Sequence, residues 1–286
     1  MAKQFTWGEA VNFTTRTRDT WRPNSRSYKT NIINAGHFTE AHGLSFPVSK
    51  ITRPLVTQLC LNLEENGMSH GTINRVISAI STVINHCADE ELCSKAPTFK
   101  RKKETEGRRQ FFTKDQVNQM RHAAVEVFGR EDLADIITFA SYTGMRQGEI
   151  FKLKARDVDF GLNLIHVGGL PDVQTKADNY RTIPMTDHVL DVVRPRLEHA
   201  KPSVRVFDDW TGKDQLLRAF NKVRSYCGIP DGYCFHVCRH SFGTWHVEAG
   251  TPIRVLMELM GHKNIETTLR YAKVTNQASI EAMAAI

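Results

Sequence analysis

The residues of this chain that are best suited to chemistry are two arginines, two histidines and a tyrosine. In chain order they are Arg146, His236, Arg239, His262 and Tyr271. The paired N–H groups of a guanidinium match the oxygens of a phosphate and stabilise the negative charge that these oxygens gain during displacement at phosphorus. A tyrosine hydroxyl, with an ordinary pKa of about 10, becomes a better nucleophile where cationic groups stabilise its ionised form. The set therefore predicts attack by a tyrosine hydroxyl on a phosphodiester.

The spacing of these residues follows an ordered pattern. The sequence has T-G-M-R-Q-G-E around Arg146, H-V-C-R-H from His236, M-G before His262, and a tyrosine nine residues after that histidine. Over residues 5–271 this pattern resembles the tyrosine recombinase (phage integrase) family. The resemblance implies that the tyrosine attacks the scissile phosphate and that five residues surround this phosphate. These five are Arg146, Lys176, His236, Arg239 and His262.

The resemblance also implies two supporting residues, which are Glu149, one helical turn after Arg146, and His240. Two positions depart mildly from the family pattern. Met260 stands where leucine is commoner before Gly-His, and Gly148 stands where a small polar residue is usual. Neither change removes a group that the predicted chemistry needs.

The lysine of the implied site lies in a polar segment. Residues 175–184, T-K-A-D-N-Y-R-T-I-P, resemble the family's β-hairpin with a catalytic lysine. The resemblance implies that Lys176 protonates the leaving 5′ oxygen, for which a mobile ammonium suits better than a guanidinium. An isolated lysine in such a hairpin is otherwise solvent-exposed and inert, and Lys154 is a weaker rival for the role.

A metal site is the competing interpretation of the H-V-C-R-H region. Cys234, His236, Cys238 and His240 are all possible ligands, but they fall within seven residues. Zinc sites usually combine two separated ligand pairs, and one helix cannot direct residues at i, i+2, i+4 and i+6 towards a single ion. We therefore expect the two cysteines to be packing residues, and we expect no metal and no other cofactor.

Composition limits the class of protein. The chain has 286 residues, 41% of them hydrophobic, and a formal net charge of +7, which favours an acidic partner such as nucleic acid. No apolar run approaches the roughly 18 residues of a membrane span, and the N-terminus has no secretory signal. Six scattered cysteines suit a reducing compartment. The expected location is the cytoplasm of a bacterial host, at its nucleoid.

Residues 1–97 read as a helical domain. The clearest helix spans residues 72–87, where apolar residues recur at steps of three and four. Its opposite face includes Asn74, Arg75 and Ser78. This face is either solvated or, as the resemblance favours, placed in a DNA major groove.

Residues 98–111 are predicted to be a basic linker. Residues 98–109 contain six basic residues against two acidic ones and have no hydrophobic period. The segment is either merely solvated or follows the phosphate backbone of DNA, which is the preferred interpretation. The basic residues at its start are Lys100, Arg101, Lys102 and Lys103.

A catalytic domain is predicted for residues 112–273. A capping box at Thr113 opens it, a buried helical face includes residues 133–140, and strands are expected at residues 162–167 and 181–185. Residues 274–286 form a tail. The resemblance favours docking of this tail on a neighbouring protomer.

The fold class expected from all of this is mainly α with a small antiparallel β-sheet. A helical core-binding domain and an α+β catalytic domain would form a C-shaped clamp on double-stranded DNA. The resemblance implies a site-specific recombinase that forms a 3′-phosphotyrosine, works as a homotetramer on two DNA sites, passes through a Holliday junction and needs neither ATP nor metal. A host DNA-bending protein or an accessory excision factor is a further partner left open. The alternatives are a type IB topoisomerase and a catalytically silent DNA-binding protein.

Overall fold

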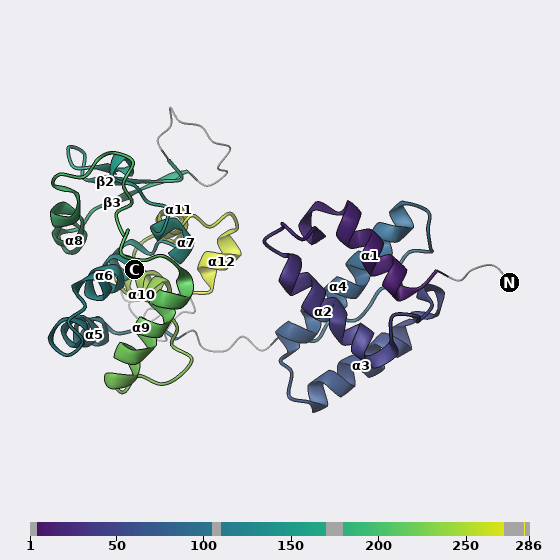
Figure 1. Ribbon diagram of the computed structural model, residues 1–286. Helices are drawn as coiled ribbons and strands as arrows, with labels where there is room; N and C mark the ends of the chain where they lie inside the picture. Colours follow the sequence, from purple (N-terminus) through teal and green to yellow (C-terminus); the bar gives the residue numbers. More distant parts are fainter. Residues whose placement is uncertain (1–4, 105–109, 170–179, 272–282, 284–286) are drawn as a thin grey trace. The chain divides into compact units, whose positions relative to one another are not determined.

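The protein is described by a computed structural model for residues 5–104, 110–169, 180–271 and 283 (Figure 1). It divides into two compact units, Met1–Gly107 and Arg108–Ile286. The fold is mainly helical with one three-stranded antiparallel sheet, which confirms the predicted fold class. Among the described residues, no helix is both long enough and apolar enough to cross a membrane.

The first unit is built around its longest helix. Its elements are α1 (Trp7–Thr17), η1 (Asp19–Trp21), α2 (Tyr28–His42), η2 (Val48–Lys50), α3 (Arg53–Glu65) and α4 (His70–Asp89). The side chain of Ser69 caps α4, and α1, α2 and α3 all pack against this helix. Its apolar residues, including Ile73 and Ile80, are fully buried. The helix predicted for residues 72–87 is confirmed and extends by two residues at each end.

The beginning of the expected linker is packed on this unit. Phe99 is buried in the core of the first unit, and Arg53 Nε donates to the carbonyl of Thr98 over 2.9 Å. The side-chain amide of Asn74 pairs with the backbone of Lys102, receiving its N–H and donating to its carbonyl, each over 2.9 Å. Residues 98–104 are therefore not a free connection. Residues 98–104 show no hydrophobic periodicity because a single apolar residue, Phe99, and hydrogen bonds to the backbone hold them on the first unit.

The second unit contains eight α-helices in its described part. They are α5 (Lys114–Glu126), α6 (Glu131–Thr143), α7 (Gln147–Ile150), α8 (Asp187–Leu197), α9 (Lys213–Tyr226), α10 (Val237–Glu248), α11 (Ile253–Met260) and α12 (Ile265–Leu269). The helix α6 is buried along most of its length and packs against α5, α8 and α10. The predicted capping box between Thr113 and Gln116 and the predicted buried face of α6 are both confirmed.

The sheet has the order β1 (Val158–Asp159), β2 (Leu164–Val167) and β3 (Arg181–Pro184), and a turn of 3₁₀-helix, η3 (Ala155–Asp157), leads into it. Ile165 of β2 lies opposite Ile183 of β3, and both are buried. The strand predicted for residues 162–167 begins later because Asn163 takes a left-handed conformation at the turn. Among the described residues β3 pairs only with β2, so the predicted edge strand is confirmed.

Candidate active site

The T-G-x-R-x-x-E motif forms a turn between α6 and α7. Gly144 ends α6 in the left-handed conformation, and a Cβ atom there would lie 2.5 Å from the ring of Phe242. The turn places Arg146 at the N-cap of α7, where its backbone N–H donates to Glu149 Oε2 over 2.8 Å and its Nη1 to Oε1 over 2.9 Å. The third bond of Arg146 runs from Nη2 to the carbonyl of Gly261 over 3.0 Å. The guanidinium is therefore held in one orientation.

The carboxylate of Glu149 joins two arginines. Besides Arg146, it accepts hydrogen bonds from Arg181 Nη2 over 2.8 Å and from Arg181 Nη1 over 3.3 Å. Burial by itself would raise the pKa of Glu149, but the hydrogen bonds and charges of the two arginines lower it to about 2. The carboxylate is thus ionised at any pH at which the protein is used.

Arg239, in the first turn of α10, connects two loops of the site. Its Nη1 donates to the carbonyl of Gly144 over 2.5 Å and its Nη2 to the carbonyl of Met260 over 2.6 Å, and the residue is only 3% exposed. Burial, followed by the charge of Arg146, lowers the pKa of Arg239 to about 9, against the opposing effect of Glu149. The guanidinium therefore remains charged at neutral pH.

The ring of Tyr271 packs closely against α10. Its hydroxyl is 2.9 Å from Nδ1 of His240, its ring is parallel to that of His262, and it is 8% exposed. A Cβ atom on Gly243 would come within 2.8 Å of the tyrosine ring, so only glycine leaves room for it. His262 in turn bonds through Nδ1 to the hydroxyl of Thr268 over 2.9 Å.

The predicted site residues therefore come from segments that lie together in the fold, namely α7, α10, the turn after α11 and residues 270–271 directly after α12 (Figure 1). His236, at the N-cap of α10, packs edge-on against His240 with ring centroids 4.9 Å apart. The residues that the structure brings into this site are Arg146, Glu149, His236, Arg239, His240, His262 and Tyr271. Lys176 lies outside the described residues, and its assignment stays a prediction.

Two residues that contact the site, Arg181 and Gly243, are not among those predicted from the sequence. Arg181 is predicted only as part of an edge strand, yet its side chain is 6% exposed and bound to Glu149. A buried arginine requires a carboxylate partner, so its place on the inward-facing register of β3 was a usable signal. For Gly243, inside the helix α10, no comparable sequence signal exists.

The two cysteines beside the H-x-x-R-H motif differ from each other. Cys238 is fully buried, which raises the pKa of its thiol to about 12, and the prediction that it packs in the core is confirmed. Cys234 is exposed because it lies in the turn before α10, so its assignment as a packing residue is wrong. In the part of the chain that the structure describes, no group of three or more His, Cys, Asp or Glu is placed to hold a metal ion.

The proposed DNA-contacting residues of the first unit divide into two sets. Arg75, Lys100 and Lys103 are exposed. Asn74 and Lys102 are instead engaged within the unit, Asn74 with the backbone of residue 102 and the Glu104 carboxylate, and Lys102 with the Glu64 carboxylate. Asn74 is 5% exposed, and both its amide donors have partners. The structure thus gives Asn74 a role in fixing residues 98–104, and its contact with DNA stays a prediction.

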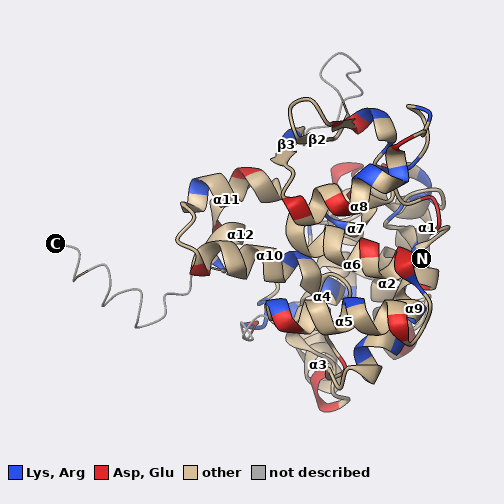
Figure 2. Cartoon of the chain, turned by 90° about the vertical axis from the view of Figure 1, so that its left-hand side faces the viewer, with Lys and Arg blue, Asp and Glu red and all other residues tan. Residues whose placement is uncertain are grey.

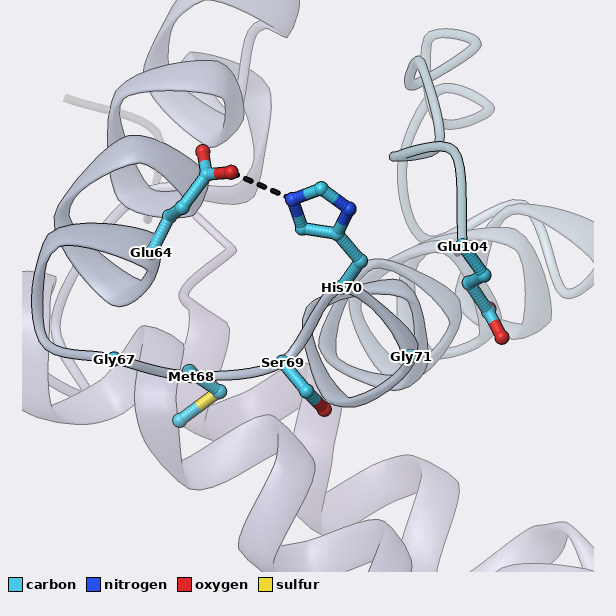
Figure 3. Close-up of a pocket in the computed structure, with 7 residues that line it drawn as sticks. All are labelled: Glu64, Gly67, Met68, Ser69, His70, Gly71 and Glu104. Carbon is cyan, nitrogen blue, oxygen red and sulfur yellow. Dashed lines mark hydrogen bonds and ion pairs between the residues drawn. The ribbon is translucent and has the colours of Figure 1, made fainter. Parts of the chain in front are cut away.

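A histidine completes this attachment (Figure 3). The ring of His70 faces Glu64 across the turn at residues 67–69, with Nε2 2.6 Å from the carboxylate, while its Nδ1 lies 2.7 Å from the carbonyl of Lys103. Hydrogen bonding to Glu64 raises the pKa of His70. Arg101 donates to the hydroxyl of Ser78 over 3.0 Å, so Ser78 is likewise used within the unit.

We expect Asn74→Ala to affect stability and Arg75→Ala to affect DNA binding. Asn74→Ala removes the two hydrogen bonds from the Asn74 amide to the backbone N–H and carbonyl of Lys102. This loss should lower the free energy of unfolding by about 1–3 kcal/mol. Arg75→Ala, at an exposed position of the same helix, should change this energy by about 0.5 kcal/mol or less. Denaturant unfolding measures both values. Equal destabilisation by the two variants would contradict the role of Asn74 in holding residues 98–104 on the first unit.

Comparison with known proteins places this arrangement in a family. The sequence model of the phage integrase family matches residues 110–278. Tyrosine recombinase XerA of Thermococcus kodakarensis is 28% identical over 225 residues, which cover 75% of this chain and 74% of the relative. Tyrosine recombinase XerD of Oceanobacillus iheyensis is 23% identical over 263 residues, covering 87% of this chain and 86% of the relative.

Solved structures share the fold. The Tn1549 transposon integrase in complex with transposon right end DNA matches with a TM-score of 0.80 at 19% identity and covers 98% of this chain and 99% of its own. A lambda integrase dimer bound to a COC′ core site matches with a TM-score of 0.75 at 16% identity, over 94% of this chain and 77% of its own.

The family match covers more than half of the chain and includes the motifs around Arg146, Arg239, His262 and Tyr271. The chain therefore belongs to the phage integrase family. It is a tyrosine recombinase, an enzyme of the class that transfers DNA strands in site-specific recombination. The resemblance noted in the sequence is confirmed, and the topoisomerase and silent-binder alternatives are not favoured.

Proposed function

We propose that Tyr271 is the nucleophile that cleaves one DNA strand at a recombination site. Its Oη atom forms a bond to the scissile phosphorus while the bond from phosphorus to the 5′ oxygen breaks. The products are a 3′-phosphotyrosine and a free 5′-hydroxyl. A 5′-hydroxyl from the partner strand then attacks the phosphotyrosine and releases the tyrosine. The number of phosphate ester bonds is unchanged, so the exchange needs no ATP.

The observation that most supports this proposal is the position of the Tyr271 hydroxyl, 2.9 Å from Nδ1 of His240. A histidine at this distance is suited to accept the phenolic proton during attack. His236 packs on His240 and is the second proposed base. Lys176 is proposed to give a proton to the leaving 5′ oxygen.

The two arginines are proposed to stabilise the phosphorane-like transition state. The side chain of Arg146 is 39% exposed, so a phosphate has access to it, and Glu149 holds it in place. Arg239 is buried and charged, and its positive charge would stabilise the ionised form of the Tyr271 hydroxyl. Fixed donors of this kind stabilise a developing charge without reorganising, and each typically contributes about 10²–10³-fold in rate.

The proposed partners are double-stranded recombination sites and further copies of the chain. We propose that both units bind one DNA site, that four protomers act on two sites, and that strands are exchanged in pairs through a Holliday junction. Residues 274–286 are proposed to dock on a neighbouring protomer. The DNA-bound relatives support duplex DNA as the ligand, and one of them is a dimer on its site. In the view of Figure 2, basic and acidic residues are interspersed on the helices, so local basic groups rather than a uniform charge are proposed to bind DNA.

A library of duplexes with random sequence and a nick near the centre tests the function. A nick lets the short cleaved fragment diffuse away, so each cleaving protein stays bonded to its DNA. We expect the DNA recovered from covalent complexes to share one sequence. Covalent complexes without a shared sequence, together with relaxation of supercoiled plasmid, would support a topoisomerase instead. Recovery of only non-covalent complexes would support a silent DNA-binding protein.

We also expect cleavage to continue in excess EDTA. The charge on the phosphate is proposed to be balanced by the arginines and histidines of the chain, so the yield of covalent complex should change by less than about twofold on chelation. A matched reaction with added magnesium measures any stimulation. Loss of the complex with EDTA and its recovery with magnesium or zinc would contradict this mechanism.

A further inference from the structure

Arg181 lies in the sheet but its side chain ends in the active site. It is the first residue of β3, it pairs with Val167 of β2, and its side chain is 6% exposed. Its guanidinium donates hydrogen bonds to three acceptor atoms on two residues. Two of its nitrogens bond to the two carboxylate oxygens of Glu149, and Nε donates to the carbonyl of Leu259 over 2.8 Å.

These contacts join the segments that hold the catalytic residues. Glu149 is the residue that orients Arg146, and Leu259 lies three residues before His262 at the end of α11. Gly261 allows this approach, because a Cβ atom there would lie 2.8 Å from Arg181 Nη1. Arg146 itself donates to the carbonyl of Gly261. One buried guanidinium thus contacts both the support of Arg146 and the turn before His262.

We propose that Arg181 is a positioning residue for DNA cleavage, which holds Glu149 and the turn after α11 so that Arg146 and His262 keep their places on the phosphate. This inference rests on the proposed function. Arg181 is not proposed to touch DNA, because its nitrogens are turned to the carboxylate and the carbonyl. A planar guanidinium fork can serve all three acceptors together, which a lysine ammonium at that position cannot.

Arg181→Ala should therefore reduce the single-turnover cleavage rate by about 10²-fold while DNA affinity changes by less than about threefold. Arg181→Lys retains the charge and one or two of the bonds, so we expect a loss of about tenfold and thus a partial rescue. A uniform loss of binding energy would instead raise the DNA concentration at half-saturation and leave the saturated rate unchanged.

The pH dependence of cleavage gives a readout that a purely structural role would not change. The charged groups acting at Glu149 are Arg146, Arg181 and Arg239. Removing Arg181 should raise the pKa of Glu149 from about 2 towards its ordinary value of 4.5, because the hydrogen bonds and charge of Arg181 no longer oppose the effect of burial. A protonated Glu149 no longer forms the ion pair that orients the guanidinium of Arg146. The Arg181→Ala enzyme should lose cleavage as the pH falls through this raised pKa, whereas wild-type protein should show no such acid limb in the same range.

Arg196 provides the matched control. It is also a largely buried arginine of the second unit, 16% exposed, and it bonds to the carboxylates of Asp135 and Asp209. Its partners lie outside the proposed active site. Arg196→Ala should thus lower stability by an amount comparable to Arg181→Ala, yet cleave at the wild-type rate per folded molecule and keep the wild-type pH profile.

The experiment measures adduct formation on a nicked recombination site for wild-type protein, Arg181→Ala, Arg181→Lys and Arg196→Ala at pH values from about 3.5 to 9, with the folded fraction measured in parallel. A large loss of cleavage rate in Arg181→Ala, together with an acid limb that only this variant shows, supports the inference. Wild-type rates in Arg181→Ala, or equal losses in Arg181→Ala and Arg196→Ala, would overturn it. Absence of adduct in wild-type protein would instead contradict the proposed function, which keeps the two failures distinct.

Discussion

Tyr271→Phe is expected to abolish strand cleavage, by at least about 10⁴-fold, while the protein still folds and binds its site. The change removes only the hydroxyl. The ring keeps its space beside Gly243 and its parallel contact with His262. Loss of the hydrogen bond to His240 should cost about 1 kcal/mol of folding stability. Covalent trapping on a nicked site measures cleavage, and a mobility-shift titration measures binding.

Tyr142→Phe is a suitable control for this prediction. Tyr142 belongs to the same unit and is partly buried. It directly precedes the T-G-x-R-x-x-E motif, but its ring packs against His188 and Trp245, neither of which is a predicted site residue. We expect it to cleave DNA at about the wild-type rate. A persistent covalent adduct in Tyr271→Phe would remove Tyr271 as the nucleophile.

The second large effect is expected for Arg146→Ala. Its guanidinium is proposed to bind the phosphate more strongly in the transition state than in the ground state, so cleavage should fall by about 10³-fold and binding by less than tenfold. Arg146 suits this test better than Arg239, since the side chain of Arg239 also joins two buried carbonyls and its loss disturbs the fold. Single-turnover cleavage at saturating protein measures the rate.

Arg75→Ala should show the reverse behaviour. Arg75 is exposed on α4 of the first unit, on the helix face that is predicted to lie in a DNA major groove, where its positive charge would be close to the DNA phosphates. Its loss should weaken binding and reduce the slope of log affinity against log salt by about 0.9, with little change in the saturated cleavage rate. Similar losses of binding and of cleavage in both variants would contradict this separation of roles.

The helices and the catalytic motifs were predictable because each rests on a local pattern. The apolar period of α4 and the capping box at Thr113 each involve residues within a few positions of one another. The motif around Arg146 was likewise predictable, since its Glu149 partner lies three residues away. Such features are encoded in short stretches of sequence and need no tertiary information.

What the sequence did not reveal depends on contacts between distant segments. Asn74 resembles the polar residue of a DNA-reading helix face, but its partners are 28 and 30 residues away. Arg181 and Glu149 are 32 residues apart, and nothing in the local sequence of β3 shows that its arginine enters the active site. The space that Gly243 leaves for Tyr271 likewise depends on how α10 and the residues after α12 pack. The position of residues that pair through the fold cannot be obtained from periodicity alone.

If Tyr271 forms the covalent bond to DNA, it must be the residue that carries the nucleotide after cleavage. Wild-type protein is incubated with the nicked site recovered from the library, the complex is digested with nuclease and trypsin, and the nucleotide-bearing peptide is sequenced by mass spectrometry. We predict that this peptide contains Tyr271 with a 3′-linked nucleotide on its hydroxyl. Attachment to Tyr180, Tyr233 or any other residue, or a cleaved site with no attached peptide, would contradict the assignment of Tyr271 as the nucleophile.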